Sequence, residues 1–256
     1  MHPAEDCMKH ALVVPTLCDS IQRNIESIIS FIDSAANEEA KFIIFPEACL
    51  TGFITDDVPE HDYKYAVPID SPYITYIKEY ACKKNVYISL GFLESVDKCI
   101  YDSVVCINPL GSIIGHYRRI SAGWHGRKAD SKVYREGKEI STFTIGKCSY
   151  CYLLCGDLFE DNLIALVKKR NPDVVIVPIA RSSENRLLTQ ELWNLEERPY
   201  YLEQVKKLKT RVFMTNYIDV RDNFYGGAFV INSDGIIEKQ KSIYEEGILY
   251  WENGSI

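Results

Sequence analysis

The sequence has no long hydrophobic run and no excess of basic residues. None of its apolar stretches approaches the roughly 18 residues of a transmembrane helix, so we expect no membrane partner. Acidic residues outnumber basic ones 36 to 29 among the 256 residues, which gives a net charge of −7. This balance argues against a nucleic-acid partner, which would favour a basic patch. The first ten residues, MHPAEDCMKH, lack the apolar core of a signal peptide, so we do not expect secretion by that route.

Low-complexity segments and linkers rich in proline or glycine are also missing. Length alone predicts about 1.7 domains, and without a linker we assign residues 1–256 to one domain. The nine cysteines are an odd number spread through the chain, which is typical of reduced thiols in the cytoplasm. Cys148 and Cys151 form a CxxC pair, but no second pair completes a zinc site. We therefore predict no metal, and we expect most cysteines to be small buried side chains.

The two halves of the sequence, residues 8–120 and 145–245, repeat one order of elements. Short apolar runs predict strands, and apolar residues spaced three or four apart predict amphipathic helices. The first half has strands at 10–14, 42–45 and 85–94, helices at 20–40 and 72–84, and a hairpin at 102–119 with its turn at 108–111. The second half has strands at 148–154, 173–177 and 210–219, helices at 162–170 and 189–209, and a hairpin at 227–241 with its turn at 232–235. The repeat predicts one α/β fold in which two sheets pack against each other.

Three reactive side chains follow predicted strands, where α/β folds usually place their sites. Glu47 lies in FIIFPEACLTGF, Arg119 in IIGHYRRIS and Cys155 in CYLLCGDLFED. The FPE motif, the CGD motif and their place in the repeated order resemble the nitrilase superfamily of carbon–nitrogen hydrolases. The resemblance covers nearly the whole chain, up to the GGAFVINSDG hairpin.

The resemblance implies a four-layer αββα sandwich of two mixed β-sheets with a pseudo-twofold internal repeat. It also implies a homodimer or higher homo-oligomer and a Glu–Lys–Cys triad, and the cysteines and the missing signal peptide lead us to expect a cytoplasmic protein. Glu47 falls on the general base and Cys155 on the nucleophile, whereas Arg119 stands at the position of the lysine. Asp130 falls where many relatives have a second glutamate.

These residue types suit the cleavage of an amide. A thiolate attacking the carbonyl replaces one difficult hydrolysis with the formation and breakdown of a thioester. Glu47 can move the protons, and the backbone N–H of Gly156 with Arg119 can hold the oxyanion. Arginine is larger than lysine and effectively never deprotonated, so three readings stay open. In the first, Arg119 donates hydrogen bonds to the oxyanion. In the second, Lys128 reaches the site from the following loop and supplies the positive charge. In the third, the site has lost its hydrolytic activity.

The substrate-binding candidates lie in loops near these three residues. They are Phe53, Trp124, His125, Asp157 and Arg181. Four of them have a structural alternative: a surface loop for Trp124 and His125, a helix cap for Asp157, and an ordinary salt bridge for Arg181. We expect the charged residues of the helix at 189–209 to form either a solvated face or an oligomer interface.

The predicted function is hydrolysis of a small linear amide or an N-carbamoyl compound, without a cofactor. The alternatives are a non-catalytic binding or regulatory protein that keeps the fold, a nitrile hydrolase and an acyl transferase.

Overall fold

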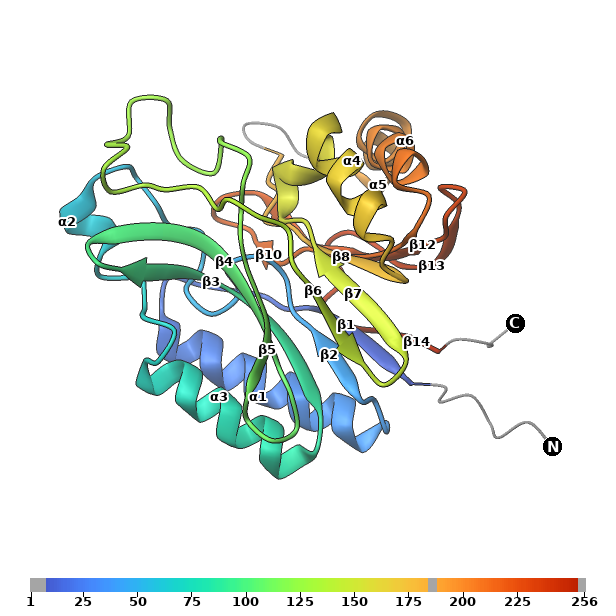
Figure 1. Ribbon diagram of the computed structural model, residues 1–256, viewed down its shortest axis with the longest axis horizontal. Helices are drawn as coiled ribbons and strands as arrows, with labels where there is room; N and C mark the ends of the chain where they lie inside the picture. Colours follow the sequence, from blue (N-terminus) through green and yellow to red (C-terminus); the bar gives the residue numbers. More distant parts are fainter. Residues whose placement is uncertain (1–7, 184–187, 253–256) are drawn as a thin grey trace.

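The computed structural model describes residues 8–183 and 188–252. Two six-stranded sheets pack face to face, and helices cover the outer face of each (Figure 1). The main core lies between the sheets, where Leu12 and Phe42 of one meet Tyr150 and Phe213 of the other. The predicted four-layer αββα sandwich is confirmed.

The first sheet has the order β14-β1-β2-β3-β4-β5. Its strands are β14 (Gly247–Trp251), β1 (His10–Val14), β2 (Phe42–Ile44), β3 (Tyr87–Val96), β4 (Cys99–Ile107) and β5 (Ile113–Arg118). β1, β2 and β3 are parallel, and the remaining pairs are antiparallel. Helices α1 (Ile21–Asn37) and α3 (Pro72–Lys84) cover its outer face, and the short α2 (Pro59–Asp62) lies at one end (Figure 1).

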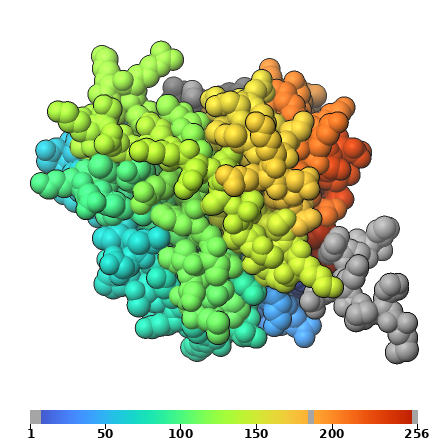
Figure 2. Space-filling model, viewed as in Figure 1, coloured from blue at the N-terminus to red at the C-terminus, as the bar shows by residue number. Residues whose placement is uncertain are grey.

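The second sheet repeats this plan with the order β6-β7-β8-β9-β12-β13. Its strands are β6 (Thr142–Ile145), β7 (Cys148–Tyr152), β8 (Val174–Pro178), β9 (Arg211–Thr215), β12 (Ala228–Ile231) and β13 (Ile237–Lys241). Its helical layer contains α4 (Asp161–Arg170), α5 (Gln190–Leu192), η2 (Trp193–Glu197) and α6 (Arg198–Leu208). A two-stranded ribbon joins β10 (Ile218–Asp219) to β11 (Phe224–Tyr225). The two halves of the chain meet along a continuous boundary at the surface (Figure 2).

Local sequence signals set the helix boundaries in the first half. The Ser20 side chain caps α1 by accepting from the Arg23 N–H at 3.4 Å. Ser71 caps α3 in the same way, and Pro72 occupies the first turn, where its missing N–H costs nothing. α3 ends at Asn85, whose left-handed backbone is a common helix terminus. These signals explain why α3 spans the predicted residues 72–84.

Several expectations need correction. Strands β6 and β14 were not predicted, and the predicted helix at 189–209 is interrupted by the π-helical segment η2. Of the eight described cysteines, all of them free, only Cys49, Cys106 and Cys151 are buried. Within the described ranges, no helix combines the length and apolar character needed to cross a membrane.

Parallel strands explain where the site lies. The carboxyl ends of β1 and β9 are joined by a hydrogen bond from Thr215 Oγ1 to the Val13 carbonyl, and those of β2 and β8 by the bond from the Ala180 N–H to Glu47. Segments that leave these strands therefore carry side chains from both halves into one place.

Candidate active site

The segments after β2, β5 and β7 bring Glu47, Arg119 and Cys155 together. Cys155 begins η1 (Cys155–Phe159), a short 3₁₀ turn, and its backbone is left-handed with φ of 44°. A residue other than glycine adopts this region at a cost of about 1–3 kcal/mol. The surrounding contacts must therefore hold the turn in place.

The carboxylate of Glu47 is completely buried and bridges the two halves of the chain. Its Oε1 accepts a hydrogen bond from Arg119 Nη1 at 3.1 Å, and its Oε2 accepts one from the backbone N–H of Ala180. Burial, and next the neighbouring Cys155, raise the pKa of Glu47 to about 8, although Arg119 acts in the opposite direction. A carboxyl group that titrates near neutral pH can both take up and return a proton.

The guanidinium of Arg119 is fixed on several sides. Its Nη1 lies 3.6 Å from Asp102 Oδ2, and its Nε donates to Ser121 Oγ at 3.1 Å. Its Nη2 lies so close to Gly156 that a methyl group at this glycine would collide with it. Burial opposes the positive charge, but Cys155 and the surrounding carboxyl groups raise the pKa of Arg119 above its ordinary value. The charged guanidinium therefore stands beside the turn that carries the thiol.

Asp157 joins the segment that carries the guanidinium to the turn that carries the thiol. Its Oδ1 accepts from the backbone N–H groups of Ile120 and Ser121, at 3.2 and 2.6 Å. Its Oδ2 accepts from the Tyr117 hydroxyl at 2.6 Å and the Leu154 N–H at 3.0 Å. Asp157 is completely buried. The structure thus corrects the expectation that Asp157 touches substrate and gives it a structural role.

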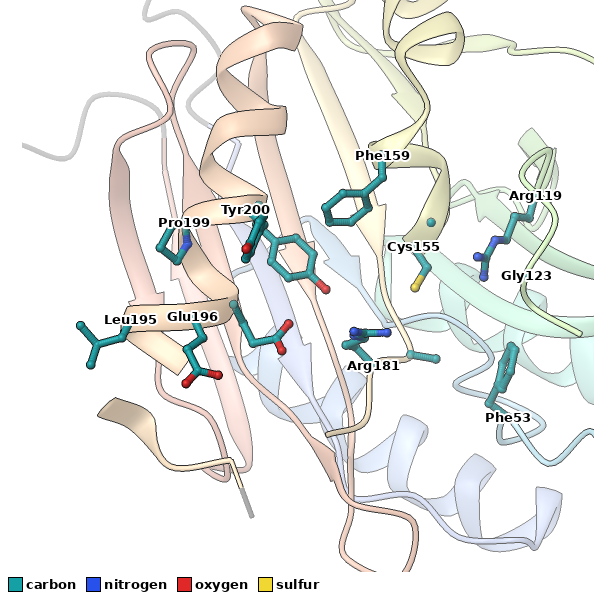
Figure 3. A pocket seen from close by; sticks show the side chains of 14 residues that line it. Phe53, Arg119, Gly123, Cys155, Phe159, Arg181, Leu195, Glu196, Pro199 and Tyr200 are labelled. Carbon is teal, nitrogen blue, oxygen red and sulfur yellow. The ribbon is translucent and has the colours of Figure 1, made fainter. Parts of the chain in front are cut away.

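A cavity of about 850 Å³ opens onto Cys155. Figure 3 shows the sulfur with the guanidinium of Arg119 on one side and that of Arg181 on the other. Phe53 and Phe159 add aromatic walls (Figure 3). Among residues 8–183 and 188–252, Cys155 is the one cysteine that lines this cavity.

Arg181 is held by its backbone, which leaves its side chain available to the cavity. Its N–H donates to Asn216 Oδ1 at 3.1 Å, and its carbonyl accepts from Asn216 Nδ2 at 2.9 Å. Phe53 and Arg181, which we predicted to bind substrate, both line the cavity, and their binding role stays a prediction.

Four other candidates do not line the cavity. Lys128 and Asp130 are exposed, and the segment between β5 and β6 that carries them projects from the body (Figure 1). The Asp130 carboxylate accepts a local N–H from Lys132 at 2.9 Å. Trp124 is buried in a separate apolar cluster, and His125 Nε2 lies 3.0 Å from Glu136 Oε1. The cation against Gly156 is therefore Arg119 and not Lys128, and Asp130, Trp124 and His125 are removed from the predicted site.

The sequence interpretation missed three carboxylates at this site. Asp102, in β4, is buried beside Arg119. Glu196 and Glu197 lie in η2, within the helix for which we expected a solvated face or an oligomer interface, and both line the cavity. A π-helical segment inside an α-helix is frequent at functional sites.

Asp56, His61 and Asp62 form the one group of potential metal ligands within the described ranges. His61 Nδ1 lies 2.7 Å from Asp62 Oδ1, which also accepts the Asp56 N–H at 3.1 Å. The other oxygen of Asp62 accepts from the Tyr134 hydroxyl at 2.6 Å. These side chains satisfy one another and do not line the cavity, so we assign them no metal.

A family model described as carbon–nitrogen hydrolase matches residues 13–252. The chain belongs to the carbon–nitrogen hydrolase family. Membership in this family implies hydrolase activity.

Known proteins similar to this carbon–nitrogen hydrolase fall into several groups. Nitrilase homolog 2 of Dictyostelium discoideum is 23% identical over 252 residues, which are 91% of this chain and 73% of that protein. Cyanide hydratase of Stereum hirsutum is 28% identical over 110 residues, which are only 39% of this chain and 30% of the hydratase.

The solved amidase from Nesterenkonia shares the fold, with a TM-score of 0.79, 14% identity, and coverage of 98% of this chain and 92% of the amidase. A structure of a variant of that amidase shows acrylamide added to its active-site cysteine.

Proposed function

We propose that this carbon–nitrogen hydrolase cleaves a small linear amide, or an N-carbamoyl compound, through a thioester on Cys155. The observation that carries the proposal is the sulfur facing the cavity between two guanidinium groups, with Glu47 buried nearby. The active-site cysteine of the Nesterenkonia amidase supports the choice of nucleophile.

In the first half-reaction, the Cys155 sulfur forms a bond to the amide carbonyl carbon while Glu47 takes the thiol proton. The oxyanion is held by Arg119 and by the backbone N–H of Gly156, which lies in the first turn of η1 and lacks an acceptor within that turn. Glu47 returns the proton to the nitrogen, the C–N bond breaks, and ammonia or an amine leaves.

In the second half-reaction, Glu47 takes a proton from water as the water oxygen attacks the thioester. The C–S bond breaks, the sulfur recovers its proton from Glu47, and a carboxylic acid leaves. A single carboxyl group with a pKa of about 8 can serve both half-reactions, because it exchanges protons readily near neutral pH. This chemistry needs no metal or organic cofactor.

We infer that the substrate carries an anionic group at the end remote from the amide. The Arg181 guanidinium faces the cavity from the wall opposite Arg119 (Figure 3). A planar guanidinium suits a carboxylate because two N–H groups can bind it at once. The cavity of about 850 Å³ has room for an acyl chain that reaches from Cys155 to Arg181.

We also propose a homodimer or higher homo-oligomer in the cytoplasm. Leu195 and Tyr200 are 68% and 64% exposed, yet both line the cavity. A partner subunit over this face would bury apolar surface and narrow the cavity mouth. The free state of the eight described cysteines is in keeping with a reducing compartment.

The test is ammonia release from a panel that pairs each neutral amide with its carboxylate-bearing analogue. We expect wild type to hydrolyse at least one pair member, Cys155→Ala to be inactive, and the matched control Cys82→Ala, at an exposed position, to retain activity. Arg181→Gln should raise KM for the anionic member and leave the neutral member unchanged.

The panel also separates the alternative functions. Ammonia release from added nitriles but not from amides would favour the nitrile hydrolase. Product that forms only with added hydroxylamine would indicate acyl transfer. Silence of wild type across amides and nitriles, with and without hydroxylamine, would favour a binding or regulatory protein and overturn the proposal.

A further inference from the structure

Asp102 is a buried carboxyl group whose oxygens accept no hydrogen bond within the described ranges. It lies on β4, where its carbonyl accepts the Arg119 N–H at 2.8 Å, and the residue is only 1% exposed. Its nearest cation is Arg119 Nη1 at 3.6 Å, beyond hydrogen-bond distance. Within the described ranges, neither of its carboxyl oxygens accepts a hydrogen bond. A buried charge left in this state would be costly.

Three carboxyl groups surround the single guanidinium of Arg119. The two carboxyl oxygens of Asp157 accept four hydrogen bonds between them. Glu47 accepts from Arg119 Nη1 and from the Ala180 N–H, so its ionised form also has donors. Asp102 is the one of these three carboxyl groups that accepts no hydrogen bond within the described ranges. Protonation of Asp102 therefore costs less than protonation of the other two.

The electrostatic surroundings act in the same direction. Burial, then the charge of Glu47 and a side-chain hydrogen bond with it, hold the pKa of Asp102 well above its usual range. Arg119 opposes this shift, and Asp157 adds to it. The hydrogen bond with Glu47 needs a donor, and between two carboxyl groups the donor can only be a protonated oxygen.

We propose that Asp102 is a positioning residue that stays protonated at neutral pH and donates its proton in a hydrogen bond to Glu47. When Glu47 ionises, its single negative charge then faces the single positive charge of Arg119. The hydrogen bond stabilises the ionised form of Glu47, so the base can accept the Cys155 proton. Asp102 itself touches no substrate, and its role in catalysis rests on the proposed function.

Infrared difference spectroscopy tests the proton directly. At pH 9, above the pKa of about 8 of Glu47, wild type should still show the carbonyl band of a protonated carboxylic acid, and Asp102→Asn should lose it. The exposed Asp130→Asn is the matched control and should keep the band. Absence of the band from wild type, or its survival in Asp102→Asn, would overturn the proposal whatever reaction the enzyme performs.

The pH dependence of Cys155 alkylation by iodoacetamide tests the positioning role without a substrate. Asn at 102 keeps a neutral donor, so the midpoint of the Asp102→Asn profile should match wild type. Asp102→Ala removes the donor, and the midpoint should move to higher pH by about one unit or more. A shift of Asp102→Asn to lower pH would show that Asp102 is ionised, and an unmoved profile in Asp102→Ala would show that it does not act on Glu47. If Asp102→Ala fails to fold, the alkylation profile of Asp102→Asn and the infrared band still test whether Asp102 is protonated.

Discussion

Replacing Arg119 by lysine should impair this enzyme even though the positive charge is kept. The guanidinium presents separate N–H groups to Glu47 and to Ser121, each at 3.1 Å, and a third nitrogen to the neighbourhood of Gly156. A lysine side chain is shorter by one bond and carries its charge on a single nitrogen, so it cannot contact Glu47, Ser121 and Gly156 at once.

The size of the effect follows from the contacts that are lost. A hydrogen bond to a charged group contributes roughly 1.5–3 kcal/mol, so the loss of one lowers kcat/KM by roughly 10- to 150-fold. Arg119→Met also removes the charge at the oxyanion, and a lost donor of that kind costs roughly 100- to 1,000-fold in kcat. Arg119→Met should nonetheless fold, because Glu47 already has a raised pKa and can take up a proton.

The assay compares kcat/KM for the best amide of the panel in wild type, Arg119→Lys and Arg119→Met. Arg118→Lys is the matched control, since Arg118 binds Glu94 at 2.8 Å outside the cavity. Its activity should be unchanged. If Arg119→Lys equals or exceeds wild type, the planar contacts are not used, and the argument from guanidinium geometry is refuted.

Four further predictions concern acidity, packing and assembly. Gly156→Ala should displace Arg119, with a loss of about 1–3 kcal/mol in the free energy of unfolding or an equivalent loss of activity, measured by urea denaturation and kcat/KM. Activity should rise with pH up to about 8 as Glu47 ionises, which a pH–rate profile measures; a flat profile from pH 6 to 9 would contradict this. Burial lowers the pKa of His10 from 6.5 to about 4, so the unfolded chain binds a proton in this window before the folded chain does. Stability should therefore fall by about 3 kcal/mol as the pH drops through it, and His10→Phe should flatten the slope in urea denaturation. Leu195→Glu should reduce the mass measured by light scattering, and an unchanged mass would place the interface elsewhere.

The sequence predicts those parts of the fold that local signals control. Ser71, Pro72 and Asn85 define one helix, and the turn at 108–111 closes with a bond from the Gly111 N–H to the Asn108 carbonyl at 2.9 Å. The repeated order of apolar runs indicates two similar sheets. β14 escapes such reasoning because its partner β1 lies at the other end of the chain, with His10 paired to Trp251.

Some residues of the site could likewise be predicted from the sequence, and others could not. Motifs indicate Glu47 and Cys155, whose roles stay predictions, and strand ends suggest that they meet. Asp102 was overlooked because the register of its hairpin shifts between Cys106 and Ile107, so counting back from the turn does not pair it with Arg119. Glu196 and Glu197 line the cavity from a π-helical segment, which an α-helical period in the sequence does not anticipate.

The central claim is that Cys155 is the nucleophile, and competitive alkylation tests it most directly. Native protein is treated with a limiting amount of iodoacetamide near neutral pH, and the labelled peptides are quantified by mass spectrometry. Cys82 is exposed and Cys155 only half-exposed, so accessibility alone would favour Cys82. We predict that Cys155 reacts faster in the folded protein and that its advantage disappears in urea. Labelling of Cys82 at an equal or higher rate in the folded protein would contradict the assignment.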